Sequence, residues 1–209
     1  MLKELTLTEF TDILGGEAPA PGGGSVAAMA GSFSAALVSM VASLTIGKED
    51  YSDVADEMNA MKAKMSDEAS LLLNMAEEDK IAFNAFMAAM KLPKSTPEEK
   101  KSRKTLMQDA LKCAASVPLE VARHAFGVFA YALQAAQDGN ENAVSDAGVA
   151  AVMAEAAVVS ACLHVKINAV SIDDSEFSLW LLTECERLIK GAAELKNEIL
   201  EIVTEKIGV

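Results

Sequence analysis

Apolar residues recur every three or four positions along most of this chain, and no segment alternates between apolar and polar residues as a half-buried strand would. The clearest case is 52–91, which contains no glycine or proline and places its apolar residues on one helical stripe. This pattern predicts one long helix that ends before Pro93. Thr96, followed by Pro97 and Glu99, predicts the capped start of the next helix.

Weaker signals place the other helices. Pro118 lies inside the second long helix, where its missing N–H group and its ring predict a kink or a split near Ser116. Caps and apolar positions indicate four more helices. The first is capped by Thr6 or Thr8 and ends at Gly15-Gly16, and the second covers 26–46. The third is capped by Ser145 and runs from Asp146 to about Val170, and the fourth opens with Asp173 and Glu176 and runs to about Ile207. These elements predict an all-α fold, a single domain over 1–209 built as a bundle of six to seven helices.

The segment 26–46 is long and apolar enough to cross a bilayer, so a membrane span has to be weighed against a buried helix. More than half of its residues are alanine, glycine or serine, and it has neither aromatic belts nor a basic cluster at either end. Small residues let helices approach closely, which favours a central helix of the bundle. We therefore expect no membrane insertion.

Charge and composition exclude several classes of function. The formal net charge of −13 opposes binding to nucleic acid. Three cysteines and two histidines form no close cluster, so a metal site is not expected. The first residues lack the basic and apolar regions of a signal peptide, which predicts a cytoplasmic protein.

The loop Pro19-Ala20-Pro21-Gly22-Gly23-Gly24-Ser25 precedes the small-residue helix. Its glycines are free to adopt positive φ, and the N–H groups at a helix start can converge on an anion or a carbonyl oxygen. The loop is therefore either a ligand cradle or a tight turn that needs glycine to reach a crowded helix. Both interpretations remain open from this stretch alone.

Charged residues interrupt two apolar stripes. Asp79 falls on the apolar face of 52–91, and it is expected to be paired, exposed in a cleft or functional, because burying it without a partner is costly. Glu68 lies on the same stripe about 16 Å away, and we expect it to be solvated or at an interface. Glu155 stands alone in an apolar helix, which favours a buried partner.

Two further features could carry chemistry. The segment 139–146 places Asn142, Ser145 and Asp146 at a helix start, where they serve either as caps or as a polar site. His124 and His164 are possible acid–base groups, although a lone histidine is more often a hydrogen-bonded structural residue.

Residues 19–31, with the sequence PAPGGGSVAAMAG, and the following 44–48 resemble the cyclodeaminase/cyclohydrolase family of folate one-carbon enzymes. The resemblance continues over nearly the whole chain, through Glu78-Asp79-x-x-Ala82-Phe83, Val117-Pro118-Leu119 and the 139–150 segment with its Gly-Asn-x-Asn and Ser-Asp-x-Gly-Val-Ala motifs. The chain departs from the family pattern at His164, where asparagine is usual, and at Ser160, where glycine is common.

The resemblance implies a homodimeric enzyme with a folate site near the subunit interface, needing no cofactor and no metal. Its reaction is that of a methenyltetrahydrofolate cyclohydrolase, favoured because no transferase domain is fused to the chain; a formiminotetrahydrofolate cyclodeaminase is the alternative. A non-catalytic helical interaction subunit is a second alternative.

The same resemblance assigns roles to residues of this chain. One of Asp79 and Asp146 is expected to act as the general acid/base. The other is expected to offset the positive charge of the folate substrate, whose one-carbon unit forms a cationic amidine with N5 and N10. The expected substrate-binding residues are Pro21, Gly22, Gly23, Gly24, Ser25, Asn142 and Ser145. Candidates of lower rank are Glu78, Glu155 and His164.

Overall fold

The computed structural model describes residues 1–208, which form six α-helices and three short 3-10 helices and contain no strand. The α-helices are α1 (Leu7–Leu14), α2 (Gly23–Thr45), α3 (Ala55–Met90), α4 (Pro97–Asp138), α5 (Val144–Ala169) and α6 (Ser175–Ile207), and the 3-10 helices are η1 (Leu2–Glu4), η2 (Glu49–Val54) and η3 (Glu141–Ala143). The prediction of an all-α bundle is confirmed.

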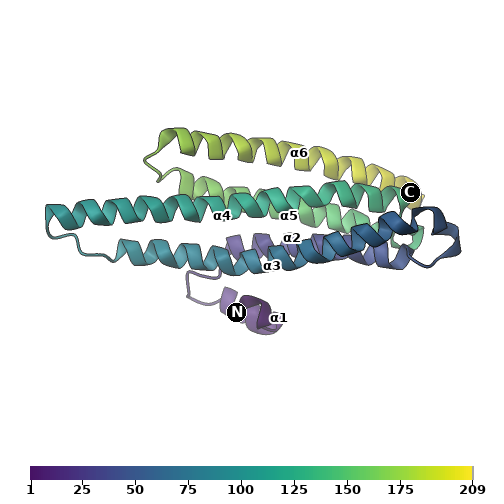
Figure 1. Cartoon of the computed structure of the whole chain (residues 1–209), viewed down its shortest axis with the longest axis horizontal. Helices are drawn as coiled ribbons and strands as arrows, with labels where there is room; N and C mark the ends of the chain where they lie inside the picture. Colours follow the sequence, from purple (N-terminus) through teal and green to yellow (C-terminus); the bar gives the residue numbers. More distant parts are fainter. Residues whose placement is uncertain (209) are drawn as a thin grey trace.

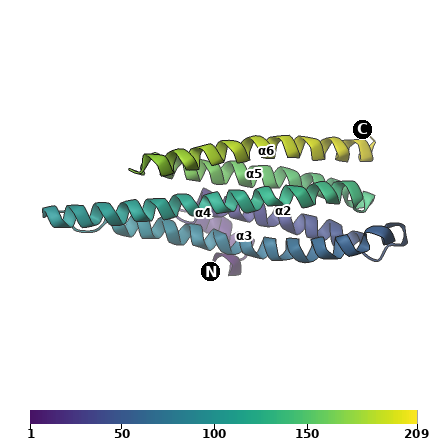
Figure 2. The same cartoon turned by 45° about the horizontal axis from the view of Figure 1, so that its top comes forward.

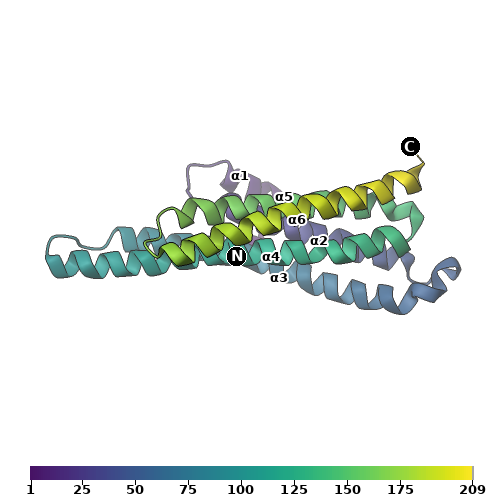
Figure 3. The ribbon, with the colours of Figure 1, turned by 90° about the horizontal axis from the view of Figure 1, so that it is seen from above.

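The bundle is elongated, with α2, α3, α4 and α5 packed along one another and α6 lying on α4 and α5 (Figures 1 and 2). The hairpin of α3 and α4 projects beyond the ends of α5 and α6 (Figures 1 and 3). Helix α2 contacts α3, α4 and α5, and its fully buried Ala28, Ala35 and Ala42 are seven residues apart. The small residues of α2 therefore do what the sequence predicts and let three helices pack closely around it.

Serine hydroxyls connect α2 to its neighbours. The Oγ of Ser32 donates to the carbonyl oxygen of Ala69 on α3 at 2.8 Å, and the Oγ of Ser34 donates to that of Ala150 on α5 at 2.7 Å. Each bond satisfies a polar side chain inside an apolar helix, as burial requires. Serine combines small volume with a hydrogen bond, which explains its frequency in this helix.

Two helical segments, Gly23–Thr45 and Glu141–Ala169, are long and apolar enough to cross a membrane by length and composition. The rest of the chain buries 67% of the most apolar window of the first segment and 50% of that of the second. A core helix passes the same test, and the burial of α2 matches the core position that the sequence predicts.

Helix α4 runs unbroken through Pro118, so the predicted split near Ser116 is wrong. A proline removes the N–H group that would bond to the carbonyl four residues earlier, which here is that of Ala114. In the structure the Nδ2 of Asn168, on α5, donates to this carbonyl oxygen at 2.8 Å. A side chain from a neighbouring helix thus replaces the missing backbone donor.

This contact makes a testable prediction. Replacing Asn168 by alanine leaves the Ala114 carbonyl without a donor in a half-buried position, and should lower the free energy of unfolding by about 1–3 kcal/mol. Chemical denaturation followed by circular dichroism measures the change. Asn59→Ala is the matched control, since the Nδ2 of Asn59 donates to the Ala55 carbonyl on an exposed helix surface; equal losses in both variants would refute the special role of Asn168.

Two predicted caps are displaced. Ser145 lies inside α5, whose N-cap is Ala143, because the short η3 helix precedes it and Asn140 caps that helix instead. Asp174, not Asp173, caps α6 by accepting from the N–H of Phe177. Thr6, one of the two predicted caps, begins α1 with a capping box, and the capping box at Thr96 is as predicted.

Candidate active site

The glycine loop ends at the start of α2, with Gly22 as the N-cap and Gly23 and Gly24 in the first turn. None of these glycines has positive φ, so the freedom that the ligand-cradle interpretation invoked is not used, whereas the need for glycine beside a crowded helix is met. They permit close approach instead: a Cβ at Gly23 would collide with Nε2 of His164, and a Cβ at Gly24 would collide with the carboxylate of Asp79. The loop therefore lies directly against two ionisable side chains.

A cavity of about 250 Å³ lies where the loop meets the helices. Four segments line it, and only two of the lining side chains are ionisable, Asp79 and His164. The lining residues are Pro19, Ala20, Gly22 and Gly24 of the loop, Asp79 and Phe83 of α3, Ala114 of α4, and His164, Ile167 and Asn168 of α5. The cavity thus combines an acid–base pair with apolar walls.

Asp79 is half-buried at the edge of this cavity. Burial raises the pKa of its carboxyl group, while the charge of His164 and hydrogen bonds from Ser25 oppose that rise in part. The hydroxyl of Ser25 lies 2.9 Å from the carbonyl oxygen of Ala76 and 3.3 Å from Oδ2 of Asp79. A raised pKa favours the protonated form of a carboxyl group, and that form can act as an acid.

The structure does not bring all the predicted residues together within one chain. Asp146 lies near the start of α5, 18 residues before His164, which is about 27 Å along the helix. The segment around it packs at the far end of α2, where the N–H of Asn140 donates to Oγ1 of Thr45 at 2.9 Å. Asn142 and Ser145, both exposed, belong to this second end. A single subunit therefore does not form the expected site with Asp79 and Asp146 side by side.

The remaining candidates lie outside the cavity. Glu78 is exposed, and Pro21 is buried against a different hollow beside η1. Glu155 forms an ion pair with Lys196 of α6, with 3.0 Å between Oε2 and Nζ, as its isolation in an apolar helix predicts. None of these three residues lines the cavity that holds Asp79 and His164.

Sequence reasoning left out four residues that line the cavity, Phe83, Ala114, Ile167 and Asn168. Phe83 and Asn168 were recognisable as the residues one turn after Asp79 and His164, on the same helical faces. The packing of α4 against α5 had no sequence signal, and it alone brings Ala114 to the site.

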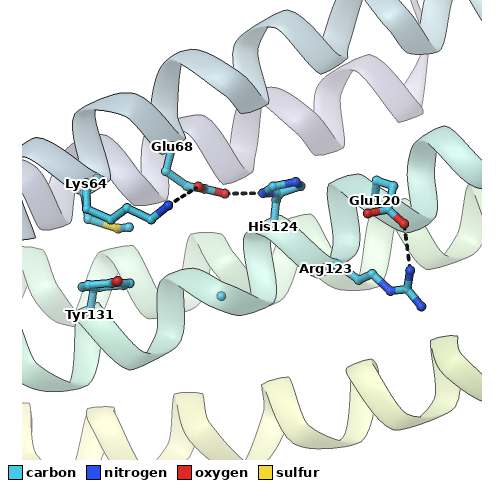
Figure 4. Close-up of a pocket in the computed structure, with 8 residues that line it drawn as sticks. Lys64, Glu68, Glu120, Arg123, His124 and Tyr131 are labelled. Carbon is cyan, nitrogen blue, oxygen red and sulfur yellow. Dashed lines mark hydrogen bonds and ion pairs between the residues drawn. The ribbon is translucent and has the colours of Figure 1, made fainter.

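A second cavity, of about 390 Å³, lies between α3 and α4 (Figure 4). Glu68 and His124 point toward each other there, with 2.6 Å between Oε1 and Nδ1, and Glu68 is only 8% exposed. The expectation that Glu68 is solvated is therefore wrong, because the packing of α4 gives it a partner; a place at a subunit interface stays a prediction. Glu120 and Glu184 likewise pair with Arg123, so charges in this cavity neutralise one another. The smaller cavity is the better candidate for chemistry.

A family model described as formiminotransferase-cyclodeaminase matches residues 6–187. Methenyltetrahydrofolate cyclohydrolase of Methylorubrum extorquens is 43% identical over 203 residues, which cover 97% of this chain and 98% of that protein. Formimidoyltransferase-cyclodeaminase of Gallus gallus is 36% identical over 96% of this chain but only 37% of that protein.

A solved structure matches as well. The crystal structure of formiminotetrahydrofolate cyclodeaminase from Thermotoga maritima is similar with a TM-score of 0.88 and 31% sequence identity, covering 99% of this chain and 100% of that chain. The chain therefore matches the bacterial proteins over their full lengths and the chicken protein over about a third of its length.

Proposed function

The chain belongs to the formiminotransferase-cyclodeaminase family, and from that premise we propose that it is a folate one-carbon enzyme that converts 5,10-methenyltetrahydrofolate and water to 10-formyltetrahydrofolate. The observation that carries this proposal is the 43% identity to a methenyltetrahydrofolate cyclohydrolase over nearly all of both chains. The second candidate is closure of 5-formiminotetrahydrofolate with release of ammonia, favoured by the likeness to the Thermotoga maritima cyclodeaminase.

The cyclohydrolase reaction needs proton transfer at defined atoms. Water adds to the methenyl carbon between N5 and N10 and loses one proton, and the bond from this carbon to N5 then breaks as N5 takes up a proton. The hydroxyl group loses its proton to become the formyl oxygen, so one proton in total is released. Asp79, whose pKa is raised by burial, is the acid that this proposal places at N5.

The glycine loop supplies binding in this proposal. The first N–H groups of a helix have no partner within it, so those of Gly23 and Gly24 are available to a carbonyl oxygen of the folate ring. The apolar side chains of Phe83 and Ile167 face the same cavity and can contact the ring surface. A larger residue at Gly24 would displace Asp79 and would disturb both substrate binding by the loop and proton transfer by Asp79.

We also propose that the enzyme is a homodimer. Exposed apolar side chains gather on α2 and α5, among them Phe33 with 47% and Leu163 with 60% of their surface accessible. Ile167, 67% exposed, belongs to this face and also lines the cavity. A second subunit on this face would cover the mouth of a cavity that, at about 250 Å³, is smaller than usual ligand sites.

The orientation of such a dimer bears on Asp146. A two-fold axis that crosses α2 and α5 reverses both helices in the second subunit. The start of its α5, with the partner subunit's Asp146, then approaches the glycine loop of the first subunit. On this proposal the two carboxylates of the expected site come from different chains.

An absorbance assay of the methenyl species tests the function. We expect the signal to fall when the protein is added to 5,10-methenyltetrahydrofolate; a rise with 5-formiminotetrahydrofolate instead would select the cyclodeaminase. No change with either substrate, together with no thermal stabilisation by tetrahydrofolate, would favour the non-catalytic interaction subunit.

A further inference from the structure

We infer that His164 is the base that takes a proton from the attacking water, working beside Asp79 in the same cavity; the inference rests on the proposed cyclohydrolase function. His164 is one of only two histidines in the chain. An imidazole can accept a proton near neutral pH.

The position of the imidazole supports this role. Its Nε2 lies so close to Gly23 that a Cβ there would collide with it, and the ring lines the cavity together with Asp79. Within residues 1–208, no hydrogen bond occupies the ring nitrogens of His164, whereas Nδ1 of His124 lies 2.6 Å from a glutamate oxygen. The free ring of His164 is therefore available to a molecule in the cavity.

The backbone around His164 is held in place. The carbonyl oxygen of His164 accepts from Nδ2 of Asn168 at 2.9 Å, and the same Nδ2 donates to Ala114 of α4. The ring is thus presented from a turn that is anchored to a second helix. Such anchoring keeps a proton-transferring group in position.

The electrostatic surroundings are simple on every side of the cavity. Helix α3 contributes the carboxyl group of Asp79, the glycine loop contributes no ionisable side chain, and α4 contributes only the apolar Ala114. The single charge that faces the imidazole across the cavity is therefore that of Asp79. The charge of His164 in turn lowers the pKa of Asp79 and so opposes part of the rise that burial causes.

The proton transfers balance with these two groups. The water oxygen bonds to the methenyl carbon while one of its protons passes to neutral His164. Asp79, protonated, gives its proton to N5 as the bond from N5 to carbon breaks, and the resulting carboxylate accepts the proton of the hydroxyl group. His164 finally releases its proton to solvent, which accounts for the one proton that the overall reaction yields.

Kinetic measurements distinguish a catalytic base from a histidine that only packs against Gly23. We expect His164→Gln to lower kcat by about 100-fold with KM changed by less than about threefold, because general base catalysis is worth about 10²- to 10⁴-fold. The low-pH limb of the kcat/KM profile should also disappear. In His164→Ala, added imidazole should restore turnover in a saturable way, after subtraction of the reaction without enzyme.

His124→Gln is the matched control, since it removes the other histidine from the separate cavity between α3 and α4. The His124→Gln variant should keep the native kcat and pH profile, although it loses the contact between His124 and Glu68. A His164→Gln enzyme with a kcat within threefold of native and an unchanged pH profile would overturn the inference. This test does not depend on whether the His164→Ala variant folds. A native chain without activity on either folate would instead refute the proposed function.

Discussion

An Asp79→Asn variant is expected to lose about 10²- to 10⁴-fold in kcat, the range that removal of a general acid or base produces. Asparagine keeps the size of the side chain and an oxygen that can accept from Ser25, but it cannot transfer a proton. The loss should therefore appear in kcat more than in KM. Steady-state kinetics on 5,10-methenyltetrahydrofolate measure both values.

The same variant should fold at least as stably as the native chain at neutral pH. The pKa of Asp79 is raised in the folded state, so its contribution to stability is fully present below the pKa of the unfolded chain and is lost as pH rises through the folded pKa. Asparagine carries no charge and removes this loss. The stability advantage of Asp79→Asn should then grow with pH between the two pKa values, as measured by thermal unfolding at a series of pH values.

Glu78→Gln is the matched control for both measurements, because Glu78 is the preceding residue of α3 and is exposed outside the cavity. It should change neither kcat nor the pH dependence of stability by a comparable amount. If Asp79→Asn retained more than a tenth of native turnover, Asp79 would not be the general acid.

Mixed dimers test whether two subunits share each site. Asp79→Asn and Asp146→Asn homodimers should both be nearly inactive, whereas co-expression of the two variants should restore about one quarter of native turnover. Half of randomly assorted dimers are mixed. In each of these, one site combines both intact residues and the other combines both replacements. Differently tagged subunits allow the mixed dimers to be purified and assayed.

The alternative arrangement gives a clear contrast. If each site lay within one chain, every site of a mixed dimer would keep one replacement, and turnover would stay as low as in the parent variants. A co-expressed pair of Asp79→Asn and His164→Gln provides the control, since these residues line one cavity of one subunit and should not complement. An Asp146→Asn enzyme with native turnover would remove Asp146 from the site altogether.

Local patterns in the sequence were sufficient to predict the α-helices, although not the unbroken course of α4 through Pro118 or the caps of α5 and α6. Apolar spacing of three and four residues, together with the capping boxes at Thr6 and Thr96, depends on contacts within one or two turns, and these contacts need no tertiary partner. The same local reasoning placed α2 as a closely packed helix and marked Asp79 as a charge on an apolar face. The motifs around them were sufficient to indicate the family.

The tertiary structure decided how these faces meet. Pro118 does not break α4, because Asn168 on another helix donates to the Ala114 carbonyl. The glycines of the loop are needed for close approach to His164 and Asp79 and not for positive φ.

The composition of the site was decided in the same way. The packing of α3 and the antiparallel α5 against α2 brings Asp79 and His164 to one cavity and leaves Asp146 at the opposite end of the bundle. Contacts between residues far apart in sequence depend on how helices dock, and a single sequence records each helical face without recording which face it packs against. The sequence by itself therefore determined the helices, the glycine loop and Asp79 as the acidic residue of the site. Only the packing of the helices selected His164 as the residue that shares its cavity.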